Sequence, residues 1–325
     1  MFRRVQQQEP ILSSSIMTRR LITERPETDV AQAIHNLLHH GISGMPVIDG
    51  IGKYLGVFSE KCCLRVLQRV SHLLGSPEDR EPVAGQFMQG DVIALTPEHD
   101  VYDAIRILLS QNISGAPVVA RNKEFLGIFS EKTSMSVLIN GAMYGLPTTT
   151  VGHFLNADRG RLIDEQTTLL EVARIFYETP YRRLAVMRGN RVVGQISRRD
   201  VLRSSRILQA ILQHQLATIE AKPDDDELHD VIRGHSELPS TSVSAVMDQH
   251  AKTVNEETDL LSIAGIFLST PYRRLPVLRG DKIVGQISRR DVLRAAMQMV
   301  EPEEVSASQV LYLSAIRSRE ESSVV

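Results

Sequence analysis

The chain has 325 residues, of which 42% are hydrophobic and 23% are charged, and its formal net charge is -2. This length suits two domains that each bury a core, and the balance is ordinary for a soluble globular protein. The composition therefore gives no reason to expect a nucleic acid or a membrane surface as partner. No segment approaches the roughly 18 consecutive apolar residues of a membrane span.

The N-terminal segment, MFRRVQQQEPILSSS, lacks the apolar centre of a secretion signal. The only two cysteines, Cys62 and Cys63, are adjacent. Neighbouring residues seldom meet the geometry of a disulfide, so we expect a reducing compartment and a cytoplasmic protein.

Four segments repeat the same order of predicted elements. Each begins with a short extended piece, at residues 20–24, 91–95, 161–165 and 251–255. A helix led by an acid or a threonine follows, with the spacing of a buried helical stripe. This stripe comprises Val30, Ile34, Leu37 and Leu38 in the first unit and Val101, Ile105, Leu108 and Leu109 in the second. Two short apolar strands joined by a turn and a second helix complete the unit.

The four units form two pairs of closely similar sequence. Residues 40–67 align without a gap on residues 111–138, and residues 179–203 differ from residues 270–294 at only five positions. The fold predicted is α/β, with four β-α-β-β-α units. At about 55 to 60 residues, one unit is too small to bury both faces of its sheet, so the units should pair.

The spacing of the units predicts that they pair in chain order. From Pro46 to Pro117 is 71 residues, whereas from Ala185 to Pro276 is 91. We therefore expect a first module at 1–145, with repeats at about 14–70 and 85–141, and a second at 146–300, with repeats at about 148–205 and 243–298. The extra residues, 206–240, predict an amphipathic helix and an acidic linker, and a further helix is expected in the tail, 301–325.

The landmark residues resemble those of the cystathionine-beta-synthase (CBS) domain. They read SGMPVID…GVFSEK, SGAPVVA…GIFSEK and, twice, RRLxV…GQISRRD. The resemblance covers about residues 14 to 300 and implies two tandem modules, each made of two repeats packed through their sheets. It also implies a regulatory protein that binds adenosine-containing ligands such as AMP, ADP, ATP, S-adenosylmethionine or dinucleotides.

The same resemblance implies the partners of the chain. Family members often form disk-like homodimers, so a homodimer is expected. The amphipathic stretches at 206–220 and 308–318 are candidates to extend that interface or to dock a separate effector protein. The adenine nucleotide is expected as a ligand, with no required cofactor.

The motif SRRD begins the second helix of units three and four. One interpretation is a capping box, in which Ser197 or Ser288 caps the helix and Asp200 or Asp291 reaches back. Units one and two keep the serine, as Ser59 and Ser130, but carry Cys62 and Thr133 in place of the aspartate.

A second difference accompanies the first. Where the aspartate is missing, the residues before the Pro-Val landmark are Ser43-Gly44 and Ser114-Gly115; where it is present they are Arg182-Arg183 and Arg273-Arg274. A capping box does not explain this joint change. A nucleotide does, because a carboxylate accepts ribose hydroxyls while guanidinium groups and helix N-terminal amides bind phosphate.

The predicted ligand site therefore lies between the two repeats of the second module. Its polar residues are Arg182, Arg183, Ser197, Arg198, Asp200, Arg273, Arg274, Ser288, Arg289 and Asp291. By the resemblance, the adenine would contact Ile163, Ala185, Met187, Thr253, Val254 and Val277, positions that would be apolar core in any case. The first module is expected to be empty, purely structural or suited to a less charged ligand.

Other functions have weaker support. His35 and His39 have a metal-compatible spacing, but no cysteine or acid completes a site, so a solvated helix surface is the preferred interpretation. The chain contains no GxxxxGK[ST], HExxH or GxSxG and no GxGxxG after a strand, so no catalytic residues are assigned and no enzyme is expected. A ligand-free docking scaffold remains an alternative. Nucleic-acid binding is less favoured, because the arginine-rich stretches lack interleaved aromatic residues.

Overall fold

The structure is a computed structural model, and it describes residues 10–74, 82–144, 149–205, 242–300 and 311–312. Repeat one holds α1 (Ser13–Ile16), α2 (Val30–His39), β1 (Gly44–Ile48), β2 (Tyr54–Ser59) and α3 (Glu60–Leu74). Repeat two holds α4 (Ala84–Phe87), β3 (Ile93–Ala94), α5 (Val101–Ser110), β4 (Gly115–Val119), β5 (Phe125–Ser130) and α6 (Glu131–Tyr144).

The second half of the chain repeats this order. Repeat three holds η2 (Val151–His153), η3 (Arg159–Arg161), β6 (Leu162–Asp164), α7 (Leu169–Glu178), β7 (Arg183–Arg188), β8 (Arg191–Ser197) and α8 (Arg198–Ser204). Repeat four holds α11 (Val243–Val246), β9 (Val254–Asn255), α12 (Leu260–Ser269), β10 (Arg274–Arg279), β11 (Lys282–Ser288) and α13 (Arg289–Val300). The predicted α/β fold and the β-α-β-β-α order are confirmed, and in repeat one the first strand is reduced to a bridge between Glu24 and Val47.

Local chemistry explains where the first helix of each repeat begins. The residue before it has an extended backbone, and its side chain accepts a hydrogen bond from a backbone N–H of the first turn; these caps are Asp29, Asp100, Thr168 and Asp259. The predicted stripes face inward, since Val30, Ile34, Leu37, Val101, Ile105 and Leu108 are all buried.

The hairpin of each repeat positions the candidate site. Its two strands are antiparallel, and the residue that begins the first strand lies opposite the serine that ends the second. Arg183 is therefore opposite Ser197, and Arg274 is opposite Ser288. Because the second helix starts directly after this serine, the arginines lie beside a helix N-terminus.

Each repeat begins with a helical turn that packs on a different repeat. We call residues 12–18, 83–89, 150–156 and 242–248 the leading segments. Segment 12–18 pairs with repeat four and segment 242–248 with repeat one, through the bridges Thr18–Gln286 and Val57–Asp248. Segments 83–89 and 150–156 are exchanged between repeats two and three, through Gln89–Gln195 and Ile128–Asn156.

The tips of the hairpins contact the same partner repeats as the leading segments do. Lys53 bridges to Lys282, and Glu124 bridges to Arg191. An apolar cluster that includes Val119, Phe125, Ala185, Met187 and Val192 fills the space between the sheets of repeats two and three. The sheets thus pair one with four and two with three, so the pairing in chain order predicted from the spacing is not what the structure shows.

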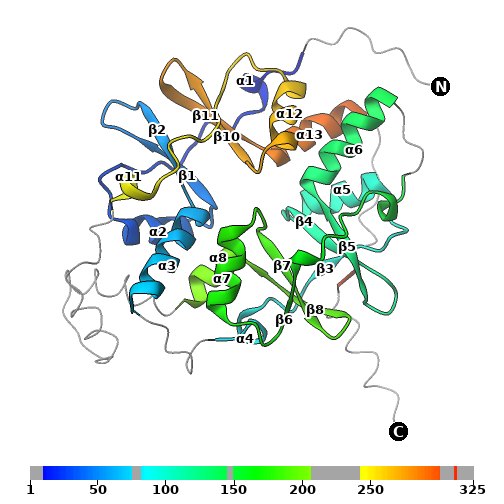
Figure 1. The fold of residues 1–325 in the computed structure, drawn as a ribbon. Coiled ribbons are helices and arrows are strands. Elements are labelled where there is room, and N and C mark those ends of the chain that lie inside the picture. The colour runs from blue at the N-terminus through cyan, green and yellow to red at the C-terminus, as the bar shows by residue number, and fades with distance from the viewer. Residues whose placement is uncertain (1–9, 75–81, 145–148, 206–241, 301–310, 313–325) are drawn as a thin grey trace.

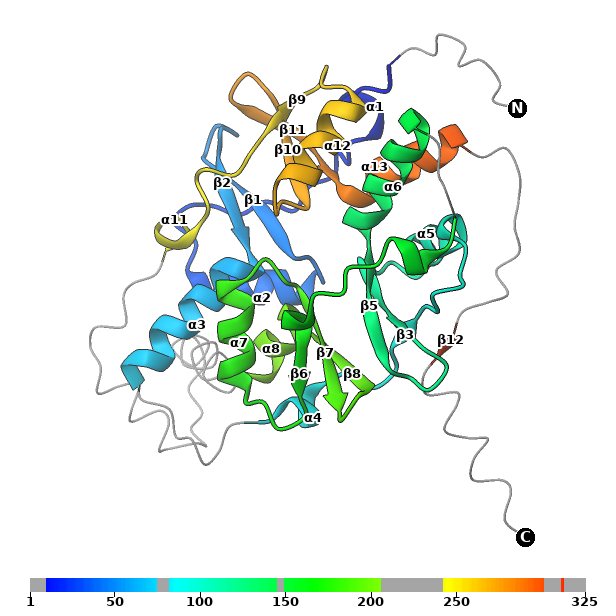
Figure 2. The same ribbon diagram turned by 45° about the vertical axis from the view of Figure 1, so that its right-hand side comes forward.

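The helices join these two sheet-paired halves. α3 packs against α7 and α8, and α6 packs against α12 and α13, so repeat one meets repeat three and repeat two meets repeat four. Two large cores result, one for each of these helical contacts. The four repeats consequently lie around a common centre (Figures 1 and 2).

The tail differs from the expected helix where it is described. Leu311 and Tyr312 form a short strand, β12, antiparallel to β3. The predicted helix and acidic linker at 206–240 lie outside the described residues. None of the helices in the described part of the chain is long and apolar enough to cross a membrane.

Candidate functional site

The SRRD motif of repeat three forms the capping box that was one of its two interpretations. The Asp200 carboxylate accepts hydrogen bonds from the Ser197 backbone N–H at 2.7 Å and the Ser197 hydroxyl at 2.6 Å, both on Oδ2. Its other oxygen, Oδ1, accepts a hydrogen bond from Gln89 Nε2 at 3.0 Å. Gln89 belongs to the leading segment of repeat two, so this turn is completed by a different repeat.

Repeat four forms the same turn with a different surrounding. Asp291 Oδ2 accepts hydrogen bonds from the Ser288 backbone N–H at 2.8 Å and from its hydroxyl at 2.7 Å. Its Oδ1 lies 3.9 Å from Arg294 Nη1. The aspartates therefore serve the fold, yet the second oxygen of Asp291 is left with no close donor among the described residues.

A cavity of about 300 Å³ lies at the meeting point of the four repeats. Its lining includes Ser197 and Asp200 together with seven arginines: Arg182, Arg183, Arg199, Arg203, Arg273, Arg274 and Arg290. Only three carboxylates share the lining, those of Glu60, Glu131 and Asp200. The predicted arginine pairs of repeats three and four are thus brought together, and the cavity carries a surplus of positive charge.

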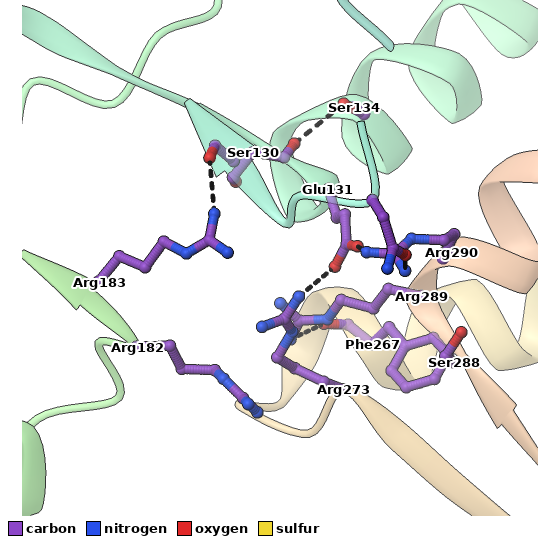
Figure 3. Close-up of polar contacts among 12 residues, drawn as sticks. Ser130, Glu131, Ser134, Arg182, Arg183, Phe267, Arg273, Ser288, Arg289 and Arg290 are labelled. Carbon is purple, nitrogen blue, oxygen red and sulfur yellow. Dashed lines mark hydrogen bonds and ion pairs between the residues drawn. The ribbon is translucent and has the colours of Figure 1, made fainter. Parts of the chain in front are cut away.

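Two buried glutamates, which the sequence comparison did not single out, hold part of this charge. Glu60 Oε2 accepts a hydrogen bond from Arg182 at 2.8 Å, and Glu131 Oε2 accepts one from Arg273 at 2.6 Å. The remaining carboxylate oxygens face Arg199 at 3.5 Å and Arg290 at 3.3 Å. Figure 3 shows Glu131 between Arg273 and Arg290, with Arg182 and Arg183 facing this group from repeat three.

The second arginine of each pair contacts the backbone of the sheet-paired repeat. Arg183 Nη1 donates to the Gly115 carbonyl at 3.4 Å, and Arg274 Nη1 donates to the Gly44 carbonyl at 3.2 Å. Gly115 and Gly44 stand where repeats three and four carry these arginines. The small residues of repeats one and two therefore leave room for the guanidinium groups of their partners.

The electrostatics of the cluster favour an anion. Burial lowers the pKa of Arg182 to about 9; Glu60 opposes this shift, while Arg273, Arg198 and Arg274 add to it. Burial also lowers the pKa of Arg183 and Arg274, and Arg273 lowers both further. At the cavity wall, the buried Nε atoms of Arg199 and Arg290 have no hydrogen-bond partner among the described residues. An anion in this cavity would relieve the repulsion between the guanidinium groups.

A larger cavity, of about 600 Å³, lies between repeats two, three and four. It is lined by the Ser130–Thr133 turn of repeat two, by Asn156, and by cations that include Lys132, Arg161 and Arg182. The sequence predicted that the first two repeats hold a site that is empty, purely structural or suited to a less charged ligand. The arginines of this cavity come from repeats three and four.

Arg198 and Arg289, both predicted to contact the ligand, bind backbone carbonyls in the structure. Arg198 Nη2 donates to the carbonyls of Phe176 and Thr179, both at 3.1 Å. Arg289 makes the same contacts with Phe267 and Thr270, at 3.1 and 3.0 Å. Each guanidinium binds the C-terminal end of the first helix in its own repeat, and only Arg289 also borders a cavity, the larger one.

The residues predicted to contact adenine are mostly core. Ile163, Met187, Val254 and Val277 are buried within apolar clusters, and Thr253 is partly exposed. Ala185 is the one member of this set that lines either described cavity. Their apolar character is fully explained by packing.

The weaker candidates have ordinary structural explanations. His35 and His39 are exposed and stack on each other, with ring centroids 5.9 Å apart. Within the described ranges, no group of three or more His, Cys, Asp or Glu is placed to hold a metal. Cys62 and Cys63 are both buried, and burial raises the pKa of the Cys63 thiol well above its usual value, which disfavours the thiolate.

Comparison with protein families now places the chain. The model of the CBS domain matches residues 13–69, 84–133, 162–206 and 243–298, well over half of the sequence. The chain belongs to the CBS domain family. Its four repeats are four CBS domains, as the motifs predicted.

Two relatives align with this chain over different lengths. The uncharacterized protein MJ1225 of Methanocaldococcus jannaschii is 22% identical over 298 residues, which span 85% of this chain and 95% of that protein. The chloroplastic protein CBSX1 of Arabidopsis thaliana, a CBS domain-containing protein, is 30% identical over 157 residues, or 46% of this chain and 65% of that protein.

Two solved structures of CBS domain proteins align with this chain. That of protein MJ1225 aligns over 88% of this chain and 99% of its own, with 20% identity and a TM-score of 0.36. That of CBSX2, a chloroplastic protein of Arabidopsis thaliana, was solved in complex with AMP; it aligns over 41% of this chain and 98% of its own, with 24% identity and a TM-score of 0.34. The family assignment rests on the sequence match.

Proposed function

We propose that this CBS domain protein is a non-catalytic sensor of an adenine nucleotide, with AMP, ADP or ATP preferred over S-adenosylmethionine. The surplus of buried guanidinium groups in the central cavity carries this proposal. Seven arginines against three carboxylates favour a negatively charged ligand. Asp200 lines the same cavity, and Asp291 accepts hydrogen bonds from Ser288, which also lines it, so we assign the sugar hydroxyls to these two aspartates.

The phosphates are assigned to Arg182, Arg183, Arg273 and Arg274, because these side chains meet in the cavity from two different repeats. The ribose is assigned to Asp200 and Asp291. The helix N-termini at Ser197 and Ser288 add backbone N–H groups at the same place. The ligand therefore contacts several repeats at once, and its binding would tighten them against one another.

Thermal denaturation with AMP, ADP, ATP and S-adenosylmethionine tests the proposal. A ligand at about 100 times its dissociation constant should add about 2.7 kcal/mol to the free energy of unfolding. Asp200→Asn combined with Asp291→Asn should remove most of this gain, whereas Cys62→Ser, in a turn without the aspartate, should not. A chain that none of these compounds stabilises is not an adenine-nucleotide sensor.

A ligand-free scaffold is the second candidate, and one observation favours it. Every carboxylate of the central cavity already accepts a hydrogen bond from within the protein, and both SRRD turns are complete capping boxes. The denaturation experiment separates the two candidates, because a scaffold gains nothing from nucleotides. Nucleic-acid binding is disfavoured, since the arginines Arg182 and Arg273 point into the centre and their side chains are only 24% and 21% exposed.

A sensor without a catalytic centre acts through a partner. We propose a homodimer, an effector protein that reads the ligand state, and a cytoplasmic location. Light scattering on the purified chain, with and without ATP, measures whether it forms the homodimer.

A further inference from the structure

The two SRRD turns face different residues from other repeats. The leading segment of repeat two brings Gln89 to the Asp200 turn, where the Gln89 and Gln195 backbones exchange hydrogen bonds at 2.9 and 3.0 Å. The leading segment of repeat one brings Thr18 to the Asp291 turn in the same manner, with Thr18 and Gln286 paired at 2.9 and 3.0 Å. The backbone arrangement is the same, and the side chain differs.

Gln89 occupies the carboxylate that a ribose would need. Its Nε2 donates to Asp200 Oδ1 at 3.0 Å, while Ser197 already donates twice to Oδ2. Both oxygens of Asp200 are therefore engaged, and the residue is only 8% exposed. A sugar hydroxyl can bind Oδ1 only if the Gln89 amide first moves away.

Asp291 has one carboxylate oxygen that accepts no hydrogen bond from the described residues. Its Oδ2 is engaged by Ser288 as in repeat three, but no hydrogen bond from any described residue reaches Oδ1. The nearest charged group, Arg294 Nη1, is 3.9 Å away, and the Asp291 side chain is 18% exposed. Thr18, which stands where Gln89 stands in the other turn, is itself exposed and has no bond to Asp291.

We propose that Gln89 makes the two nucleotide sites unequal. The Asp291 site binds a ribonucleoside phosphate through its vicinal hydroxyls, whereas the Asp200 site is closed by Gln89 and binds the same ligand more weakly. The inference rests on the proposed function and names Gln89 as the residue that sets the difference. Since a hydrogen bond to a carboxylate must be given up at the Asp200 site, the two affinities should differ about tenfold or more.

Calorimetric titration of the whole chain with ATP, and separately with AMP, tests the inference. The wild-type chain should show one tight and one weak site. Asp291→Asn should remove the tight site, and Asp200→Asn should leave it unchanged. Gln89→Thr, which copies the residue found at the other turn, should raise the affinity of the weak site about tenfold. Thr18→Gln, the reverse exchange, should weaken the tight site.

The sugar hydroxyls give an independent readout. Replacing ATP by 2′,3′-dideoxy-ATP should lower the affinity of the tight site about tenfold and hardly change that of the weak site. Thermal denaturation without ligand should show a somewhat lower midpoint for Gln89→Thr than for wild type, because Asp200 loses one hydrogen bond while the backbone pairing with Gln195 is kept.

The possible failures are distinct. If neither ATP nor AMP binds the wild-type chain, the proposed function is wrong and this inference fails with it. If both nucleotides bind to two equal sites, or if Asp200→Asn removes the tight site, the proposed function stands and the role of Gln89 is wrong.

Discussion

Glu60 and Glu131 place a negative charge inside the arginine cluster of the ligand-free protein. Each is buried, at 4% and 3% exposed, and each holds two arginines of another repeat. An anionic ligand would compete with these carboxylates for Arg182 and Arg273. Under the proposed function, the two glutamates would set how strongly the cavity attracts phosphate.

Glu60→Gln tests this competition. We expect it to lower the free energy of unfolding of the ligand-free protein by roughly 2 to 3 kcal/mol, because two buried guanidinium groups lose their counter-charge. Added ATP should stabilise this variant more than it stabilises the wild type. Both effects are measured by denaturant titration with and without ATP.

Glu165→Gln is the matched control for this substitution. Glu165 also binds an arginine, Arg188, but that guanidinium is 63% exposed and lies away from the cavity. Its removal should hardly change the stability or the effect of ATP. Equal losses of unfolding free energy in the two variants would mean that the burial of the ion pair of Glu60 does not make it more stabilising than an exposed pair.

The lowered pKa of Arg182 predicts a pH dependence. Burial brings this pKa from its usual, much higher value down to about 9, so the protonated side chain is less favourable in the fold than in the unfolded chain. The ligand-free protein should gain stability as the pH rises above about 9, because the unfolded state then binds more protons. ATP affinity should stay constant from about pH 7 to 8.5 and fall by pH 10 as the charge is lost.

Calorimetric titrations at these pH values check the expectation, with Arg182→Gln as the control. The variant should bind ATP more weakly at neutral pH and lose less affinity on going to pH 10. An affinity for the wild type that is unchanged at pH 10 would show that Arg182 keeps its proton or does not contact the ligand.

Comparing the four repeats identified the charged residues that differ between them. It did not identify the residues of other repeats that form hydrogen bonds with those charged residues. Arg182, Arg183, Asp200 and their counterparts stood out because two repeats carry them and two do not. Glu60 and Gln89 were missed, since each acts on a residue more than a hundred positions away. The one available signal was that Glu60 and Glu131 occupy the positions of Arg198 and Arg289 in the motif, a reversal of charge between the two kinds of repeat.

At the level of elements, a glycine in the second hairpin strand makes room for each leading segment. A Cβ on Gly285 would lie 2.5 Å from Met17 Sδ, and a Cβ on Gly56 would lie 2.6 Å from the Asp248 carbonyl oxygen. Both distances are far too short for real contacts. The close approach is therefore part of how one repeat accepts the segment of another.

Gly285→Ala should displace Met17 and Thr18 from the sheet of repeat four. We expect a loss of about 1 to 3 kcal/mol in the free energy of unfolding, the usual cost of overpacking. Because Thr18 lies beside the Asp291 turn, nucleotide binding should weaken as well. Thermal denaturation and ATP titration measure the two effects.

Gly265→Ala is the corresponding control. Gly265 lies within α12, is exposed, and has open space where a Cβ would be added. Alanine is preferred to glycine inside a helix by about 0.5 to 1 kcal/mol, so this variant should be slightly more stable than wild type. If both alanines destabilise alike, the close packing of Gly285 is not the cause.

The elements themselves were largely predictable. Helix periodicity gave α2 and α5, and the paired apolar runs gave every hairpin, because these features depend on neighbours in the sequence. The leading segments were not recognised as sheet partners. They pair through backbone groups at residues such as Thr18 and Gln89. Backbone pairing does not require particular side chains, so the amino-acid sequence does not reveal it.

At the scale of the whole molecule, sheet contacts and helical contacts both cross between the two halves of the chain. Repeat one shares its sheet contacts with repeat four and its helical contacts with repeat three. Separate modules at 1–145 and 146–300 would each lack the sheet partner of both repeats. The spacing between repeats measures the length of a connection, and that length does not determine which sheet a repeat will join.

Splitting the chain tests this arrangement. Residues 1–146 and 147–325, expressed apart, should each give poorly folded protein by circular dichroism and denaturant titration. Co-expressed, they should purify as one complex with a cooperative transition near that of the intact chain. A first fragment that folds alone with full cooperativity would support pairing in chain order instead.

The exchange of leading segments also has a consequence for synthesis on the ribosome. Repeats two and three can exchange segments as soon as about two thirds of the chain has emerged, whereas repeat one must wait for the last repeat before its sheet finds a partner. The earliest part of the chain is therefore the last to be protected. Closing so long a loop is slow, and during that interval the unpaired hairpin of repeat one is the segment most exposed to aggregation and to chaperones.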